Sequence, residues 1–355
     1  MESISRSTNA ARVDFRRRLL IACCAAIAGL LLTFRQRAIA AQSSTLQTGA
    51  AHAGLPAGRE LTDEIGRKVH VPQEVNRVVS LAPNLTEIVF ALGDGDRLAG
   101  DTDYCDYPAE AALKPHVGGP VNPSLEEVVA LKPDLVLATS INRRETVSAL
   151  GSIGVPVYIV DPHSVEEMIA SVEHIGNAMG TEKSATALAG DLRARLADLH
   201  RRLAGVAARR ALFIVWTDPL ISVGRDTFIA DALRHAGGKS VVDTKVEWPH
   251  PGMEEIVRLQ PEFLVFASAH GGDTQRDIEE LRTRPGWKSL AAMQRGDIIV
   301  VSDAINRPAP RMVDAIEQLA RALHPEAFAS IEMPSINSNS ANNTPAIEEA
   351  CLCAR

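Results

Sequence analysis

One helix-and-strand segment occurs twice in this chain, at residues 122–137 (NPSLEEVVALKPDLVL) and again at residues 250–265 (HPGMEEIVRLQPEFLV). Each copy has a Glu pair at the start of a short helical stretch, then a proline, then an apolar run typical of a strand. A unit repeated at such a distance predicts two similar lobes. Two lobes enclose a cleft, and clefts between domains are common ligand sites.

Strand and helix patterns alternate on both sides of the midpoint. Because apolar runs separated by helical segments are typical of parallel sheets covered on both faces, we predict an α/β fold with two doubly wound lobes. The lobes are expected to span residues 76–178 and 210–328. The expected strands include residues 77–83, 135–138, 157–160, 211–216 and 297–301.

The segment between the lobes, residues 179–209, has no proline and carries leucines at helical spacing among charged residues: Leu188, Leu192, Leu196, Leu199 and Leu203. This pattern predicts one amphipathic helix of roughly 25 residues, about 38 Å long. Such a rigid helix would join the lobes, with the ligand cleft between them, and limit how far they swing.

The ends of the chain differ from the lobes. Residues 61–75 alternate around Gly66 and predict an N-terminal hairpin. Residues 41–60, rich in Ala, Gly, Ser and Gln, predict a flexible tether. Residues 329–355 turn to Ser, Asn, Pro and Ala and predict a disordered tail.

Residues 1–40 have the layout of a secretory signal peptide. Arginines precede the apolar run 19–34, and small residues at 38–40 offer a cleavage site. The run is short for a spanning helix, which needs roughly 20 apolar residues. We therefore expect an exported protein.

Three other interpretations of this segment stay open. Residues 20–23 resemble the lipobox of a lipoprotein, and Arg16 and Arg17 loosely resemble a twin-arginine signal. An uncleaved segment would instead anchor the protein in a membrane.

Charge and cysteine content narrow the class of partner. The net charge is −7, with 44 acidic and 37 basic residues interleaved, so no basic face favours nucleic acid. Cys105, Cys351 and Cys353 would remain after signal cleavage, and they do not form the even set of a disulfide framework. A soft-metal pair at Cys351 and Cys353 is the alternative.

Catalytic motifs are scarce. The chain contains no Gly-x-Ser-x-Gly, no phosphate-binding Gly-x-x-x-x-Gly-Lys and no His-Glu-x-x-His. We therefore expect a binding protein without catalytic residues or protein metal ligands. A two-lobed enzyme using His163, His250 or His270 as acid or base is the rival interpretation.

A few aromatic and charged residues lie where a ligand would bind. Tyr104, Trp216 and Trp248 fall in or beside loops at strand ends, where flat faces suit a large, partly apolar ligand. Core packing is the alternative for each of them. Asp303 and Arg307 lie in a proline-stiffened loop and offer hydrogen bonds to polar groups, or an ion pair within the loop.

The two glutamates of each pair in the repeat have different expected roles. Ser124 with Glu127 fits a capping box, and Gly252 with Glu255 is a weaker counterpart. Glu126 and Glu254 are left without a capping role, although the helix dipole gives an acidic residue there about 0.3–1 kcal/mol. The functional alternative is that each lobe presents one carboxylate to arginines of a partner.

Together these segments resemble the substrate-binding proteins of the iron-siderophore, haem and vitamin B12 importers, most closely the cobalamin-binding subgroup. The resemblance covers residues 61–326 and rests on residues 77–87, 101–108, 122–137, 237–238 and 248–249. It implies two α/β lobes joined by one long helix, a shallow cleft with little closure, a periplasmic location and a monomer. It also implies an ABC permease and its ATPase subunits as partners.

The resemblance implies roles for particular residues. Glu126 and Glu254 match the glutamates that dock to permease arginines. Tyr104, Trp248 and the loop from Asp303 to Arg307 match residues of the cobalamin pocket.

The chain departs from this pattern at two positions. It has Pro120 and Ile221 where the cobalamin binder has a tryptophan and a phenylalanine, and Trp216 offers a replacement face. We expect a corrinoid as transported ligand, with no cofactor of the protein's own. One alternative is a ferric siderophore, which favours several convergent basic groups, of which the chain offers chiefly Arg307, with Arg225 as a second. The other is haem, with Tyr104 or His250 as axial ligand.

Overall fold

The computed structural model describes residues 58–268 and 274–329. The expected signal peptide, most of the expected tether, His270, Cys351 and Cys353 lie outside the described residues. Within them, no helix is long and apolar enough to cross a membrane. The same ranges contain no group of three or more His, Cys, Asp or Glu side chains able to hold a metal ion.

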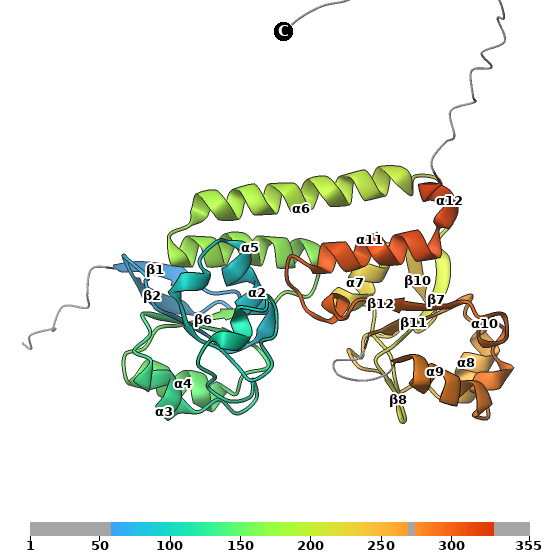
Figure 1. Ribbon diagram of the computed structural model, residues 1–355, viewed down its shortest axis with the longest axis horizontal. Coiled ribbons are helices and arrows are strands. Elements are labelled where there is room, and N and C mark those ends of the chain that lie inside the picture. The colour runs from blue at the N-terminus through green and yellow to red at the C-terminus, as the bar shows by residue number, and fades with distance from the viewer. Residues whose placement is uncertain (1–57, 269–273, 330–355) are drawn as a thin grey trace, which may run out of the picture. The chain divides into compact units, whose positions relative to one another are not determined.

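A small hairpin begins the described chain (Figure 1). Strands β1 (Gly58–Thr62) and β2 (Lys68–Pro72) pair antiparallel around the turn at Gly66, whose φ is 85°. The strand starts earlier than expected, because residues 58–60, assigned from the sequence to the tether, pair with β2. Arg59 also ties the hairpin to the next layer by donating to the carbonyl oxygen of Ala178 at 3.1 Å.

The first lobe contains a four-stranded parallel sheet in the order β4-β3-β5-β6. All five residues of β5 are buried, as expected for a strand covered on both faces. The strands are β3 (Val78–Ser80), β4 (Leu98–Gly100), β5 (Leu135–Thr139) and β6 (Val157–Val160), and the helices are α2 (Pro83–Ala91), η1 (Gly95–Arg97), η2 (Ala111–Leu113), α3 (Leu125–Ala130), α4 (Arg144–Ser152) and α5 (Val165–Met179).

The second lobe contains another four-stranded parallel sheet, in the order β10-β7-β11-β12. Its strands are β7 (Arg209–Ile214), β10 (Gly238–Ser240), β11 (Phe263–Ala267) and β12 (Ile298–Val301), with a separate hairpin of β8 (Trp216–Thr217) and β9 (Leu220–Ile221). Its helices are α7 (Phe228–His235), α8 (Met253–Leu259), α9 (Thr274–Thr283), η3 (Trp287–Ser289), α10 (Ala291–Arg295), η4 (Asp303–Asn306), α11 (Met312–Leu323) and α12 (Pro325–Phe328).

The two sheets have the same topology. Numbered within each lobe, both run second, first, third, fourth, and the repeated segments supply α3 with β5 and α8 with β11, the third strand in each case. Lys132 and Gln260, with φ of 49° and 45°, each stand directly before a proline, and each brings the chain out of its helix in the left-handed region. The predicted α/β fold with two similar lobes is confirmed.

The lobes are linked by α6 (Glu182–Arg202), a helix of 21 residues, or about 32 Å. It is shorter than the helix expected over residues 179–209. Leu203 caps it, Gly205 follows with a φ of 80°, and Arg209 already belongs to β7. The predicted helix was too long because Leu203 continues the apolar spacing, although it lies beyond the last helical turn.

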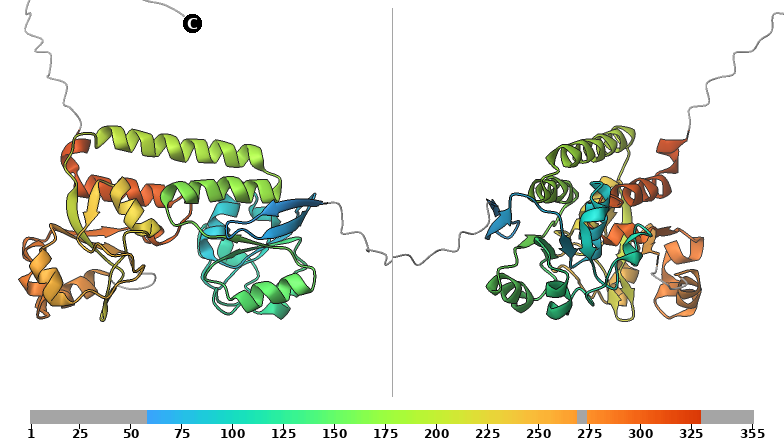
Figure 2. Two further views of the ribbon diagram at one scale, coloured as in Figure 1. Left: turned by 180° about the vertical axis from the view of Figure 1, so that it is seen from behind. Right: turned by 60° about the vertical axis from the view of Figure 1, so that its left-hand side comes forward.

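Helix α6 packs on both lobes (Figure 2). In the first lobe Arg193 pairs with Glu166 and Glu173 of α5; in the second, Arg195 pairs with Glu317 of α11 at 3.0 Å. The largest cluster of buried apolar side chains runs beneath these helices and contains residues of both sheets. The opposite face of each sheet has a smaller core of its own. The link is thus embedded in a shared core.

Candidate functional site

A cavity of about 640 Å³ opens at the carboxyl ends of β7, β11 and β12. Ligands of open parallel sheets bind beyond these strand ends. Three residues chosen from the sequence, Trp216, Asp303 and Arg307, all line it. The other lining residues are Ile214, Val215, Thr217, Phe266, Ala267, Ser268, Thr274, Asp277, Glu280, Leu281, Arg284 and Asn306.

Trp216 supplies the broad apolar surface of this cavity. Its side chain is 61% exposed, and its indole nitrogen donates to the carbonyl oxygen of Asp218 at 2.9 Å. Ile221 stands directly opposite Trp216 in the β8–β9 hairpin. The hairpin therefore holds a large aromatic face in solvent, where core packing does not account for it.

Asp303 and Arg307 form the polar edge of the cavity. The backbone N–H of Asp303 donates to Ser268 Oγ at 2.9 Å, which fixes η4 to the end of β11. Asp303 Oδ2 lies 3.6 Å from Arg307 Nη2, so the ion pair within the loop that the sequence allowed is present.

Arg307 also reaches across to the first lobe. Its Nη1 lies 2.7 Å from Asp106 Oδ1 and 3.2 Å from Glu87 Oε1. Arg311 forms a bidentate pair with Glu87, at 2.9 Å from Nε to Oε2 and 2.7 Å from Nη2 to Oε1. We call Glu87, Asp106, Arg307 and Arg311 the inter-lobe clasp.

Three of the four clasp side chains are largely removed from water. Glu87 is 2% exposed, Arg307 14% and Arg311 21%, whereas Asp106 is 44% exposed. The Arg311 guanidinium also stacks on Tyr107, with its central carbon 3.7 Å from the ring centroid. Burial alone would lower the pKa of Arg307, but its bonds to Asp106 and Glu87 outweigh that effect and raise it. Both guanidiniums are therefore held as cations between carboxylates.

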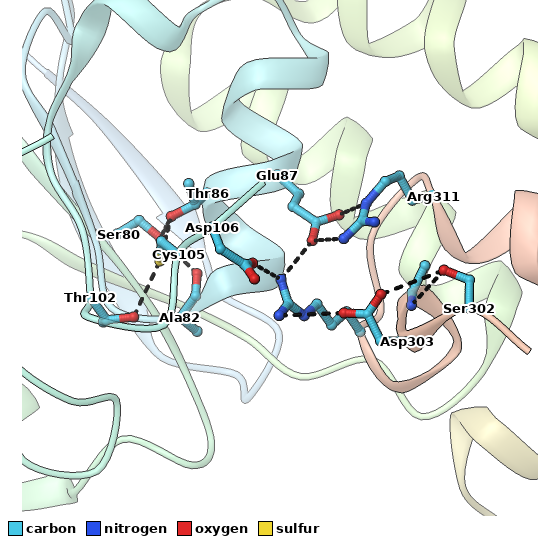
Figure 3. Close-up of polar contacts among 12 residues, drawn as sticks. Ser80, Ala82, Thr86, Glu87, Thr102, Cys105, Asp106, Ser302, Asp303 and Arg311 are labelled. Atoms are coloured by element: carbon cyan, nitrogen blue, oxygen red, sulfur yellow. Dashed lines mark hydrogen bonds and ion pairs between the residues drawn. The ribbon is translucent and has the colours of Figure 1, made fainter. Parts of the chain in front are cut away.

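A buried cluster of hydroxyl and thiol groups positions the two clasp carboxylates. Thr86 Oγ1 lies 2.9 Å from Ser80 Oγ and 3.2 Å from Cys105 Sγ, and Thr102 Oγ1 lies 3.2 Å from the same sulfur. This cluster pins the start of α2 to the loop after β4 (Figure 3). Glu87 and Asp106 directly follow Thr86 and Cys105, so they emerge side by side. Burial raises the pKa of the Cys105 thiol, consistent with a packing role.

Tyr104 and Pro120 belong to the first lobe and are not among the residues that line the cavity. Tyr104 is 62% exposed and packs beside Gly119. Asn142 donates to the carbonyl oxygens of Pro120 and Leu81, at 2.6 and 3.1 Å, and so holds this loop near the end of β3. The structure places both residues by the strand ends of their lobe.

Trp248 lies on a loop beside β9 and is also absent from the cavity lining. Ser222 donates its N–H to Pro249 and Gly224 to Glu247, so residues 247–249 run alongside this strand. A side chain at Gly224 would meet the carbonyl oxygen of Val246 at 1.9 Å, which explains the glycine. Trp248 is 42% exposed.

Glu126 and Glu254 lie in the first turns of α3 and α8, and both are exposed. Within residues 58–268 and 274–329, neither carboxylate forms an ion pair or side-chain hydrogen bond. Ser124 Oγ accepts from the Glu127 N–H at 3.3 Å, as the capping motif predicted, whereas Gly252 offers no side-chain cap.

The sequence interpretation missed Glu87, Asp106 and Arg311. One signal was available for Glu87, an acidic residue in a short apolar helix, where Leu85, Ile88 and Val89 are buried beside it. Its partners lie 220 and 224 positions away, so local patterns gave no sign of the pairing. Of the histidines considered for an enzyme, His163 and His250 are exposed.

The family model for "Periplasmic binding protein" matches residues 78–304. An uncharacterized ABC transporter substrate-binding lipoprotein of Bacillus subtilis, YvrC, is 31% identical over 277 residues, covering 76% of this chain and 86% of that protein. A vitamin B12-binding protein of Vibrio cholerae is 28% identical over 256 residues, covering 71% of this chain and 90% of its own.

Solved structures agree on the fold. The vitamin B12-binding protein BtuF of Vibrio cholerae matches with a TM-score of 0.61 at 26% identity, covering 72% of this chain and 98% of its own. The haem-binding protein RhuT of Roseiflexus sp. RS-1 matches with a TM-score of 0.64 at 25% identity, covering 71% and 99%. These proteins bind and do not catalyse, so the enzyme interpretation is wrong. The chain belongs to the periplasmic binding protein family of substrate-binding proteins.

Proposed function

We propose that this chain is exported, captures cobalamin or a related corrinoid, and delivers it to the permease of an ABC importer. The observation that carries the proposal is the cavity at the strand ends of the second lobe. It combines the exposed indole of Trp216 with the Asp303 and Arg307 pair at its edge. A corrin ring has a flat, largely apolar body and a rim of amides, which matches this combination.

The ligand sits, in this proposal, with one face toward Trp216. Tyr104 and Trp248 are exposed on loops of the two lobes and contact its outer parts. Ile221 pairs with Trp216 across the β8–β9 hairpin, and Pro120 follows Gly119, which packs against Tyr104; both are smaller than an aromatic side chain and leave room at the rim. Asp303 and Arg307 bond to amides, which offer both donors and acceptors. The cobalt arrives held by the corrin, so no protein ligand is required.

Delivery uses the two equivalent glutamates. Glu126 and Glu254 occupy the same place in the two copies of the repeat and are exposed without a partner in the described parts of the chain. Each would pair with arginines of the permease, one per lobe, and grip it at two points.

Haem is the second candidate. The observation in its favour is the exposed phenol of Tyr104, since tyrosine is an axial ligand for haem iron. The similarity to RhuT supports the same interpretation.

Isothermal titration calorimetry with cyanocobalamin and with haemin, on the same purified protein, separates the two candidates. We expect cyanocobalamin to release heat and saturate at one equivalent, with Trp216→Ala weakening it by about tenfold or more, a loss of the size of one aromatic contact. Absence of binding at micromolar concentration would refute the corrinoid. A shift of the haem Soret absorption band on binding, abolished by Tyr104→Phe, would establish haem instead.

A further inference from the structure

The inter-lobe clasp places carboxylates around the arginine that faces the cavity. Arg307 contacts Asp106 at 2.7 Å, Glu87 at 3.2 Å and Asp303 at 3.6 Å. Arg311 is committed to Glu87 through two bonds and to the Tyr107 ring. Each guanidinium is thus already engaged by protein groups.

Three carboxylates lie around the Arg307 guanidinium. Those of Asp106, Glu87 and Asp303 all approach it within 4 Å, and Glu87 is shared with Arg311. The side chains of Glu87 and Arg307 are 2% and 14% exposed, so solvent screens their interactions poorly. A ligand that reaches Arg307 therefore meets carboxylates that already occupy this guanidinium.

This arrangement discriminates between polar groups at a ligand's edge. A carboxylate at Arg307 must displace a bonded carboxylate or lie beside three of them. A neutral amide can donate to Asp303 and accept from Arg307 while the clasp stays closed. Specificity of this kind comes from a repulsive element as much as from an attractive one.

The backbone at both carboxylates is fixed, and the Glu87 side chain cannot easily move aside. Glu87 follows Thr86 and Asp106 follows Cys105, and these two residues belong to the buried hydroxyl and thiol cluster at the start of α2. Glu87 itself is buried and gripped by Arg311 on its second oxygen. The repulsion from Glu87 is therefore built into the first lobe, while the more exposed Asp106 is held by its bond to Arg307.

We propose that Glu87 and Asp106 are specificity-determining residues that make the site select a macrocycle with neutral amide side chains over one with carboxylates. The inference rests on the proposed function for the position of the ligand's rim. It adds two residues of the opposite lobe to the site and assigns them a role in rejection.

Matched ligands test this proposal. Cyanocobalamin is compared with each of its isomers in which one peripheral amide is hydrolysed to a carboxylate, in the wild type, Asp106→Asn and Glu87→Gln. We expect at least one isomer to bind the wild type about tenfold or more weakly than cyanocobalamin. That penalty should fall by about tenfold in both variants, because each removes one repelling charge.

A control variant separates rejection of carboxylates by Glu87 and Asp106 from the general effect of losing an ion pair. Glu317→Gln breaks a pair with Arg195 that lies between α11 and α6, and it should leave the penalty unchanged. Asp106 is 44% exposed, so Asp106→Asn remains informative if Glu87→Gln fails to fold. The proposal is overturned if no isomer is weakened in the wild type, or if the penalty persists in the variants.

Failure of the corrinoid assignment is read separately, from absent binding of cyanocobalamin itself. The same comparison is then made with iron protoporphyrin and its diamide. If Glu87 and Asp106 reject carboxylates, the wild type binds the diamide more tightly than the dicarboxylate, and Asp106→Asn loses that preference. Tighter binding of the dicarboxylate by the wild type would overturn it.

Discussion

At the scale of single residues, a buried carboxylate anchors the loop that carries Tyr104 and Asp106. Asp101 is fully buried, with Oδ1 2.8 Å from His116 Nδ1, and its N–H and C=O bond to Pro115 and Val117. Burial raises its pKa from 3.8 to about 6, although the bond and charge of His116 act in the opposite direction. The fold therefore disfavours the ionised form of Asp101 relative to its protonated form.

The sign of the resulting pH dependence follows from the raised pKa of Asp101. The folded protein binds this proton more tightly than the unfolded chain does, so the group's stabilisation is complete at low pH. It is lost as the pH rises from about 4 to about 6, by up to about 3 kcal/mol. We expect Asp101→Asn to remove this loss. The free energy of unfolding of the variant, relative to that of the wild type, should therefore rise as the pH goes from about 4 to about 6. Urea denaturation at successive pH values measures the difference, and parallel curves would contradict the assignment.

Residue patterns could predict part of the site but not its counter-charges. Trp216 and Asp303 come shortly after the ends of β7 and β12, and Arg307 follows the short helix η4, so their convergence follows from parallel-sheet topology. Glu87 and Asp106 meet Arg307 only because the lobes come together, 220 and 201 positions apart in sequence. The structural ion pair that the sequence offered as the alternative at Arg307 is present, and the ligand contact stays a prediction.

At the scale of elements, α5 and α6 approach each other closely where the link leaves the first lobe. A Cβ on Gly176 of α5 would lie 2.2 Å from the Cβ of Ala185 on α6. Gly190, also inside α6, is exposed and has open space around it. The first glycine serves the packing of the link, and the second serves no contact in the described structure.

These two glycines predict opposite effects of one substitution. Gly176→Ala should lower the free energy of unfolding by about 1–3 kcal/mol, because the helices must separate. Gly190→Ala should raise it by about 0.5–1 kcal/mol, because alanine is the better helix former and meets nothing. Denaturant titration of both variants provides the comparison, and a neutral Gly176→Ala would contradict the close approach.

The order of elements was accessible from sequence because the repeat and the apolar runs are strong local signals. The repeated segment supplies most of the third strand in each lobe, and the residues with positive φ, Lys132 and Gln260, occupy corresponding places in its two copies. The end of α6 was not accessible in the same way, since Leu203 continues the apolar period beyond Arg202 while Gly205 turns the chain.

At the scale of the whole molecule, the repeat places Glu126 and Glu254 at corresponding positions of two lobes with one topology. The lobes are held by α6, by a shared core and by the inter-lobe clasp. A molecule tied together in this way suits a partner that contacts both lobes at once.

Charge reversal at both glutamates should separate binding from delivery. In Glu126→Lys with Glu254→Lys, we expect ligand affinity within about twofold of the wild type, since the changes lie away from the cavity. Uptake by cells should be lost, because lysines repel permease arginines.

The neighbouring glutamates supply the matched control. Glu127→Lys with Glu255→Lys incurs a similar helix-dipole cost, about 0.3–1 kcal/mol at each site. It should retain most of the uptake. Equal loss in both double variants would show that the helix starts, and not these two carboxylates, are what matters.

The most direct test of the central claim is cobalamin uptake by a strain from which this gene has been deleted. Uptake of labelled cyanocobalamin is measured with the deletion alone and after complementation. The account predicts that the wild-type gene restores uptake and that the variant with Glu126→Lys and Glu254→Lys does not. Uptake that is unaffected by the deletion, or that the wild-type gene fails to restore, would contradict it.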